Sequence, residues 1–183
     1  MKHIPPEAVI LFEDETTLRW FPPLRASWAP RGTQAQVRIT GQNAKRVLFG
    51  TIDLRTGHRV VLGRRRAWQE DFQAFLRELR RRYHDRPIHM LLDAASCHTA
   101  HRSQQLAGRL GIVLHWLPKQ CPELNAMDHL WRELKGHVAA NRQYATIDDE
   151  LVAAEAWVLG LTPTQARRKA GILSATFWLR ALL

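Results

Sequence analysis

The chain has 183 residues, of which 45% are hydrophobic and 7 are tryptophan, and this size and composition exclude a disordered segment and a minimal peptide module. Its two cysteines form no Cys-x-x-Cys pair, no apolar run reaches membrane-spanning length, and prolines break the N-terminus, so we expect a protein of the reducing cytoplasm without a membrane segment or signal peptide. The 27 basic residues outnumber the 17 acidic ones, and this net charge of +10 favours a polyanionic partner such as nucleic acid.

The first half of the chain predicts a strand, a hairpin and an amphipathic helix. Residues 8–14 (AVILFED) form an apolar run that ends in acids, which is typical of a buried strand. Residues 16–34 contain scattered Pro, Gly and Trp and are expected to form an irregular excursion. Two β-branched runs, 45–54 and 58–63, are separated by a short turn and indicate a hairpin. Apolar residues at helical spacing predict a helix over 67–84.

The second half alternates strands with helices. Residues 87–93 are an apolar run that stops at an aspartate, and residues 112–118 are a second buried run. The segment between them predicts a helix over 99–111 that ends at a glycine. A longer helix is expected over 123–140, and a capping box at Thr146 starts another. Antiparallel pairing followed by strand–helix–strand crossovers indicates one α/β domain, a mixed sheet with helices on its faces.

Three aspartates occupy positions where such a sheet can hold a metal. Asp14 and Asp93 each end a predicted strand, and the carboxyl ends of parallel neighbours meet at one edge of a sheet. Asp128 lies at the edge of the apolar stripe of the 123–140 helix, which could bring it over the same edge. Three carboxylates without a soft ligand suit Mg²⁺ or Mn²⁺. The alternatives are ordinary strand-end caps and, for Asp128, an ion pair with Arg132 one turn later.

Four segments form a spaced series of motifs. They are LFEDET at 11–16, SWAPRGTQ at 27–34, LLDAASCH at 91–98 and LPKQCPELNAMDHLWRELK at 117–135. Together they resemble the catalytic domain of DDE transposases, in particular the bacterial insertion sequences related to the mariner superfamily, and the last motif is the most specific. The resemblance implies an α/β fold of the RNase H-like type, a mixed five-stranded sheet flanked by helices. It also implies a catalytic core over residues 1–145, with C-terminal helices at 146–183 that pack on this core or on a partner.

The same resemblance implies a reaction. Asp14, Asp93 and Asp128 match the catalytic acids, which would hold two Mg²⁺ ions that Mn²⁺ can replace. The implied activity is cleavage of DNA phosphodiester bonds at transposon ends and strand transfer into target DNA. The implied partners are double-stranded DNA and a second copy of the chain, in a homodimer on DNA. Because the chain begins at its first strand, a separate helix-turn-helix polypeptide that recognises the ends is also expected. The expected location is the bacterial cytoplasm, in association with the nucleoid.

Other residues are expected to support the three acids or to contact DNA. Glu15, next to the first acid, is expected either to support it or only to cap the strand. His98 matches a family histidine and is expected to orient a ligand or contact DNA, with a structural role as the alternative. Asn125 is expected to brace the start of the helix that carries the third acid. The basic side chains expected to contact DNA phosphates are Arg31, Lys45, Arg46, Lys119, Arg132 and Lys135. The cysteines and histidines at 97, 98, 115 and 121 match no zinc ligand spacing.

Two departures from the family pattern favour an alternative function. Ala94 stands where the pattern has Asn, and Ala126 stands where it has Pro. The third acid, Asp128, is Glu in most of the bacterial group and Asp in the mariner relatives. The alternative is a remnant of a transposase that binds DNA or a partner without catalysis.

Overall fold

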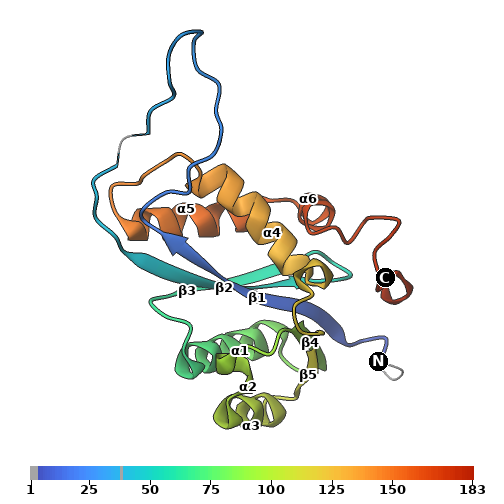
Figure 1. The fold of residues 1–183 in the computed structure, drawn as a ribbon. Helices are drawn as coiled ribbons and strands as arrows, with labels where there is room; N and C mark the ends of the chain where they lie inside the picture. The colour runs from blue at the N-terminus through green and yellow to red at the C-terminus, as the bar shows by residue number, and fades with distance from the viewer. Residues whose placement is uncertain (1–3, 38) are drawn as a thin grey trace.

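A five-stranded sheet forms the centre of the structure, a computed structural model that describes residues 4–37 and 39–183. Its strands are β1 (Val9–Arg19), β2 (Lys45–Asp53), β3 (Arg59–Arg64), β4 (Ile88–Leu92) and β5 (Ile112–Trp116), in the order β3-β2-β1-β4-β5 (Figure 1). The first three strands pair antiparallel, whereas β1, β4 and β5 run parallel. This arrangement confirms the mixed five-stranded sheet expected from the sequence.

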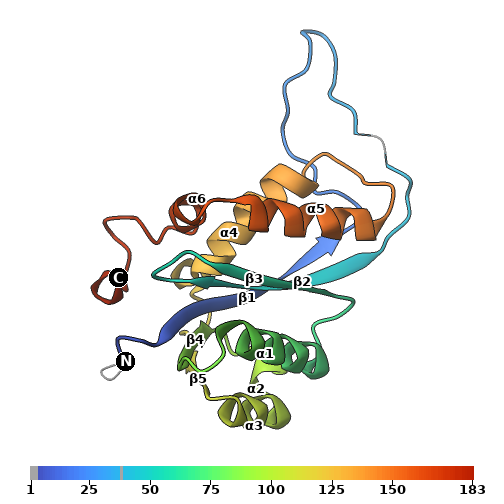
Figure 2. The same ribbon diagram turned by 180° about the vertical axis from the view of Figure 1, so that it is seen from behind.

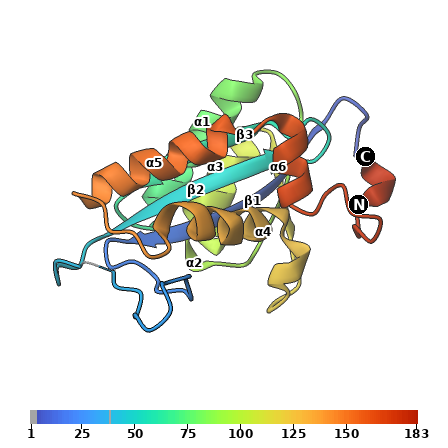
Figure 3. The same ribbon diagram turned by 90° about the horizontal axis from the view of Figure 1, so that it is seen from above.

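Helices cover both faces of the sheet, as Figures 1 and 2 show from opposite sides. One face carries α1 (Gln69–Tyr83), α2 (Ser96–Thr99) and α3 (His101–Arg109), and the other carries α4 (Ala126–Leu134), α5 (Ile147–Gly160) and α6 (Pro163–Lys169). Seen from above, α4 and α5 lie side by side over β1 and β2 (Figure 3). Short 3₁₀ turns at Pro122–Leu124 and Arg180–Leu182 and a π turn at Lys135–Ala139 complete the elements. Among the described residues, no helix is long and apolar enough to cross a lipid bilayer.

Three elements differ from the expected boundaries. β1 continues to Arg19, five residues beyond the predicted strand, because residues 15–19 pair with β2 and bury Leu18. The irregular excursion therefore occupies residues 20–37 and 39–44, which project away from the body in Figure 1. The helix predicted over 123–140 is divided into a 3₁₀ turn, α4 and the π turn, and the one over 99–111 begins earlier, as α2 and α3.

Strand β1 supplies side chains to two separate cores. Ile10, Phe12 and Leu18 face α4 and α5, whereas Val9 and Leu11 face α1. Successive side chains of a strand point to opposite faces, so this strand is buried on both sides and reads as a continuous apolar run. Residues of the C-terminal segment, from Ile147 to Leu179, join the first of these cores. The division of the chain at residue 145 remains a prediction.

Gly50 allows α4 to approach the sheet closely. It lies in β2 directly opposite Asp14 of β1. A Cβ atom at Gly50 would come within 2.6 Å of the ring of Trp131 and 2.9 Å of the side chain of Met127, both on α4. The missing side chain therefore determines how near α4 lies to Asp14.

Substituting this glycine should weaken the fold. We expect Gly50→Ala to lower the free energy of unfolding by about 1–3 kcal/mol, because overpacking forces α4 outward. Urea denaturation followed by circular dichroism measures this. Gly108→Ala in α3 is the matched control, since nothing lies within 4 Å of the added Cβ and alanine favours the helix by about 0.5–1 kcal/mol. Equal destabilisation by the two variants would contradict the close approach.

Candidate active site

The three predicted acids line one cavity of about 430 Å³ beside the end of β4. β1 and β4 are parallel with Phe12 opposite Leu91, and continuing this register by two residues brings Asp14 next to Asp93. Asp128 enters from α4, and the loop from Leu117 to Pro122 after β5 forms another wall. Because β1 is longer than expected, Asp14 lies within its strand, not at its end.

Asp14 carries a carboxyl group that is costly to ionise. Burial raises the pKa of Asp14 to about 8, and the nearby carboxylates of Glu15, Asp128 and Asp93 raise it in the same direction. Asp128 and Asp93 therefore both lie close enough to Asp14 to disfavour its charged form. A divalent cation in the cavity would relieve this repulsion.

Asp93 is held by hydrogen bonds to one of its oxygens. Its Oδ1 accepts a hydrogen bond from the backbone N–H of Ala95 at 3.0 Å and lies 3.0 Å from Nδ1 of His98. The hydrogen bond from His98 lowers the pKa of Asp93 and keeps this acid ionised. Within the described residues Oδ2 takes part in no such bond, so it remains available to a ligand in the cavity.

Asp128 lies in the first turn of α4, whose start is fixed by Asn125. The side chain of Asn125 accepts a hydrogen bond from the N–H of Met127 at 3.0 Å and donates one to the carbonyl of Glu13 at 2.8 Å. It therefore caps α4 and fastens it to β1, which is the bracing role expected of it.

Asp128 also forms the ion pair that the sequence offered as an alternative. Its Oδ2 accepts hydrogen bonds from Nε of Arg132 at 3.0 Å and Nη2 at 2.6 Å. The Arg132 side chain is 60% exposed, and a solvent-exposed i,i+4 pair contributes only about 0.3–0.5 kcal/mol. A cation in the cavity can therefore compete with Arg132 for this carboxylate.

A second cluster of acids lies behind Asp93 and was not anticipated. Glu13 is fully buried on the face of β1 opposite to Asp14, and Nε2 of His98 lies 3.3 Å from its Oε2 and 3.4 Å from Oε2 of Glu15. Burial would lower the pKa of His98, but the carboxylates of Glu13, Asp93 and Glu15 raise it to about 12. Burial also raises the pKa of Glu13 well above its usual value. The burial of Glu13 could have been predicted from the alternation of side chains along β1, because Glu13 falls on the same face of the strand as the buried Val9 and Leu11.

Residues 9–150 match the family model described as DDE superfamily endonuclease. The chain belongs to this family. An insertion element IS630 uncharacterized 39 kDa protein from Shigella sonnei is 26% identical over 143 residues, which are 77% of this chain and 42% of that protein. The mariner Mos1 paired-end complex with Mg superposes with a TM-score of 0.70 at 19% identity, covering 95% of this chain and 54% of the Mos1 chain. The catalytic domain of Mos1 alone gives 0.62 at 16% identity, covering 90% and 76%.

These similarities establish the RNase H-like fold of this DDE endonuclease domain. The chain spans about half the length of the IS630 protein and of the Mos1 chain in the complex.

The basic residues expected to contact DNA are not gathered in one place in this DDE endonuclease domain. Lys119 lines the acid cavity, and Arg132 adjoins it through Asp128. Lys135 instead lines a hollow beside the start of the excursion, with Phe21 and Pro22. Arg31 lies within the excursion itself, in a hollow that Asn141 also lines.

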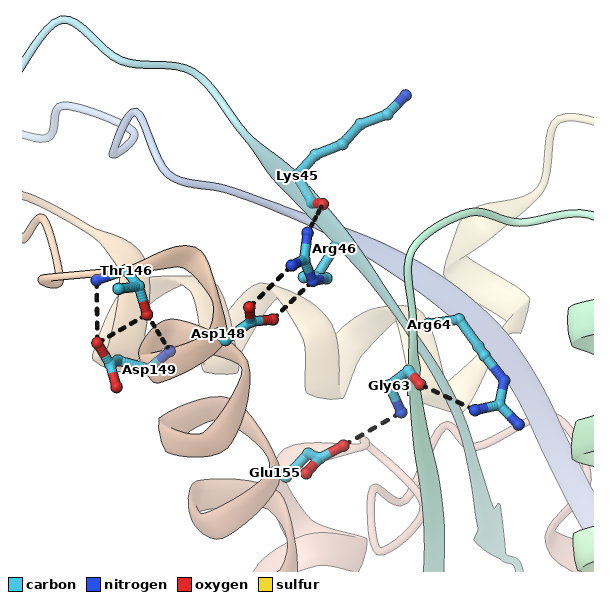
Figure 4. Close-up of polar contacts among 8 residues, drawn as sticks. All are labelled: Lys45, Arg46, Gly63, Arg64, Thr146, Asp148, Asp149 and Glu155. Carbon is cyan, nitrogen blue, oxygen red and sulfur yellow. Dashed lines mark hydrogen bonds and ion pairs between the residues drawn. The ribbon is translucent and has the colours of Figure 1, made fainter.

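Arg46, at the start of β2, forms an ion pair with another residue of the fold. Its guanidinium forms two hydrogen bonds to Asp148 of α5, at 2.7 and 2.8 Å, and its side chain is only 19% exposed (Figure 4). The neighbouring Lys45 projects away from this pair in the same view. Of these two adjacent basic residues, Lys45 is therefore the one whose side chain is oriented to contact a phosphate. Arg46 joins α5 to the sheet.

Removing the amide of Asn125 should destabilise the domain. We expect Asn125→Ala to lower the free energy of unfolding by about 1–3 kcal/mol, because the helix loses its cap and the carbonyl of Glu13 loses its donor. Asn125→Asp restores the acceptor but not the donor and should recover part of the loss. Urea denaturation of the three proteins checks this, and an alanine variant as stable as the wild type would contradict the bracing role.

The raised pKa of Asp14 should appear in the stability of the metal-free protein. The pKa is about 8 in the folded chain against a reference of 3.8, so the folded state holds this proton more tightly. The free energy of unfolding therefore falls as pH rises from about 4 to about 8. Asp14→Asn removes this penalty and should be more stable than the wild type by about 1–3 kcal/mol at pH 8. Denaturation of both proteins in EDTA at pH 5 and at pH 8 measures the difference between their free energies of unfolding. If this difference is the same at both pH values, the raised pKa of Asp14 is contradicted.

Proposed function

We propose that this domain is the catalytic part of a transposase that cleaves DNA phosphodiester bonds at transposon ends and joins the freed strand to target DNA. The observation that carries the proposal is the convergence of Asp14, Asp93 and Asp128 on one open cavity. Membership of the DDE endonuclease family supports a nuclease. The similar Mos1 structures include complexes with a transposon end, with Mg and with Mn.

The donor set fits hard divalent cations. All three side chains offer carboxylate oxygens, which are the ligands that Mg²⁺ and Mn²⁺ prefer. Oδ2 of Asp93 and the second oxygen of Asp128 lie outside the hydrogen bonds formed by these residues. Asp14, Asp93 and Asp128 would hold two Mg²⁺ ions, and these would supply activation of the attacking oxygen and stabilisation of the departing one.

The remaining residues of the site position the acids and the DNA. His98 and Ala95 fix Asp93, and Asn125 fixes the helix that presents Asp128. Lys119 lies on the cavity wall and Arg132 beside it, where both could bind the phosphate being cleaved. Binding of double-stranded DNA, action as a homodimer, and cooperation with a separate helix-turn-helix polypeptide in the bacterial cytoplasm belong to the same proposal.

The ion pair between Asp128 and Arg132 favours a second candidate function. With Ala94 and Ala126 it suits a remnant that binds DNA without cutting it. The basic net charge of +10 serves either function.

Nicking of supercoiled plasmid with Mg²⁺ or Mn²⁺ tests the proposal. We expect the wild type to nick, and Asp93→Asn to lose at least about a hundredfold in rate, because a metal clamp that lacks one carboxylate no longer stabilises the transition state. Asp85→Asn, at an exposed aspartate before β4 that does not line the cavity, is the matched control and should keep full activity.

Equal nicking by the wild type and Asp93→Asn would reveal a contaminating nuclease and sink the catalytic proposal. If no protein nicks but all retard DNA in a gel, the remnant is the correct function.

A further inference from the structure

The cluster behind Asp93 contains four potential metal ligands from two elements. Glu13 and Glu15 project from β1, and Cys97 and His98 lie on α2. Ligand atoms of Glu15, Cys97 and His98 all lie within 4.8 Å of one another. Glu13 adds Oε2 at 3.3 Å from Nε2 of His98. We infer that these four residues form a zinc site, separate from the three-acid cavity.

Two distances within the cluster match the edge of a tetrahedron around a single ion. Zinc binds nitrogen and oxygen at about 2.0–2.1 Å, and the edge of a tetrahedron is about 1.63 times the bond length, so such ligands lie about 3.3–3.4 Å apart. The distances from Nε2 of His98 to Glu13 and Glu15 are 3.3 and 3.4 Å. One imidazole nitrogen, two carboxylate oxygens and one thiolate make a donor set that suits zinc and not Mg²⁺.

The polar atoms of this cluster lack the partners that buried atoms require. Glu13 and His98 are fully buried, and among residues 4–37 and 39–183 neither oxygen of Glu13 nor Nε2 of His98 has a hydrogen-bond partner. Oε2 of Glu15 is also buried without one. A buried carboxylate left unpaired is costly, and each such group calls for an explanation. A cation at the centre of the cluster supplies all of these atoms with a partner at once.

The orientation of His98 leaves the correct nitrogen free for the metal. Its Nδ1 lies 3.0 Å from Oδ1 of Asp93 and 3.1 Å from the backbone carbonyl of the same residue. Placing the proton on Nδ1 gives the carboxylate–histidine–zinc arrangement, in which the lone pair of Nε2 faces the ion.

A proton on Nε2 is the competing occupant of the cluster. An imidazolium would neutralise part of the charge of Glu13 and Glu15, but its N–H should then point at an acceptor. The two contacts from Nε2 are close without forming a hydrogen bond. A shared ion would instead give Nε2 and both carboxylates a direct ligand bond and would displace this proton.

The cluster differs from the set of cysteines and histidines at 97, 98, 115 and 121, whose spacing in the sequence matched no zinc site. His115 pairs with His89, at 2.9 Å between ring nitrogens, and Cys121 borders the three-acid cavity. The ligands that accompany Cys97 and His98 come instead from β1, about 80 residues earlier in the chain. This site does not depend on the proposed transposase function.

Metal analysis and cobalt substitution test the inference on the full chain. We expect the wild type, dialysed after zinc loading, to keep stoichiometric zinc by mass spectrometry. Replacement by Co²⁺ should give the intense visible bands of a tetrahedral site and a near-ultraviolet thiolate-to-cobalt band. Cys97→Ser should remove the thiolate band and weaken zinc binding at least about tenfold. Cys121→Ser is the matched control and should change neither.

The variant Asp128→Asn separates this site from the three-acid cavity, because it should abolish nicking and leave the cobalt spectrum unchanged. Glu13→Gln should weaken zinc binding as Cys97→Ser does, and circular dichroism establishes that each variant is folded. A folded wild type that retains no zinc and gives no tetrahedral cobalt spectrum would overturn the inference and leave His98 as a buried imidazolium. Retention of the thiolate band in Cys97→Ser would overturn it equally.

Discussion

Three consecutive acids in a buried strand are the constraint on which the rest of this structure depends. Burial raises the pKa of each of Glu13, Asp14 and Glu15. In the described part of the chain, no lysine or arginine forms an ion pair with any of them, and His98 is the only basic side chain that approaches Glu13 and Glu15. Strand alternation sends Asp14 to one face of the sheet and its two neighbours to the other. The fold therefore places carboxyl groups that are costly to ionise on both faces at one point, and a bound cation on either face would stabilise their charged form.

The two faces are connected through a few rigid contacts. Asp93 is the acid that links them, since one of its oxygens contacts His98 while the residue lines the cavity on the other side. Asn125 connects α4 to the carbonyl of Glu13, and Gly50 lets the same helix lie close against β2 opposite Asp14. An ion bound among Glu13, Glu15 and His98 would thus hold Asp93 in place from behind. Precise placement of carboxylates depends on such supporting contacts.

The sequence predicted the sheet well because its strands are apolar runs with clear ends. It also predicted that Asp14, Asp93 and Asp128 would meet, from helix periodicity and the family motifs. The strand-end argument holds for Asp93 but not for Asp14, which reaches the cavity from within β1 through the register of β1 with β4. The sequence did not predict the extension of β1 to Arg19, which depends on pairing with β2. The pairing of Arg46 with Asp148 joins residues 102 positions apart, and such a contact has no local signal. The sequence did not single out Glu13, because the family motif covers only the neighbouring acids Asp14 and Glu15. The one indication that Glu13 is buried is the alternation of inward and outward side chains along the strand.

The three acids of the cavity differ in how firmly they are held, and this difference bears on how the site can act. Asp14 lies within a central strand, and Asp93 is fixed by His98 and Ala95. Asp128 lies half-buried in the first turn of its helix and is held by Arg132, whose side chain is largely exposed. A weak pair of this kind can open when a cation or a phosphate arrives, because each offers one of the two partners a stronger interaction. The same contact that suggests an inactive remnant is therefore equally suited to an active site in which Arg132 leaves Asp128 for the DNA backbone.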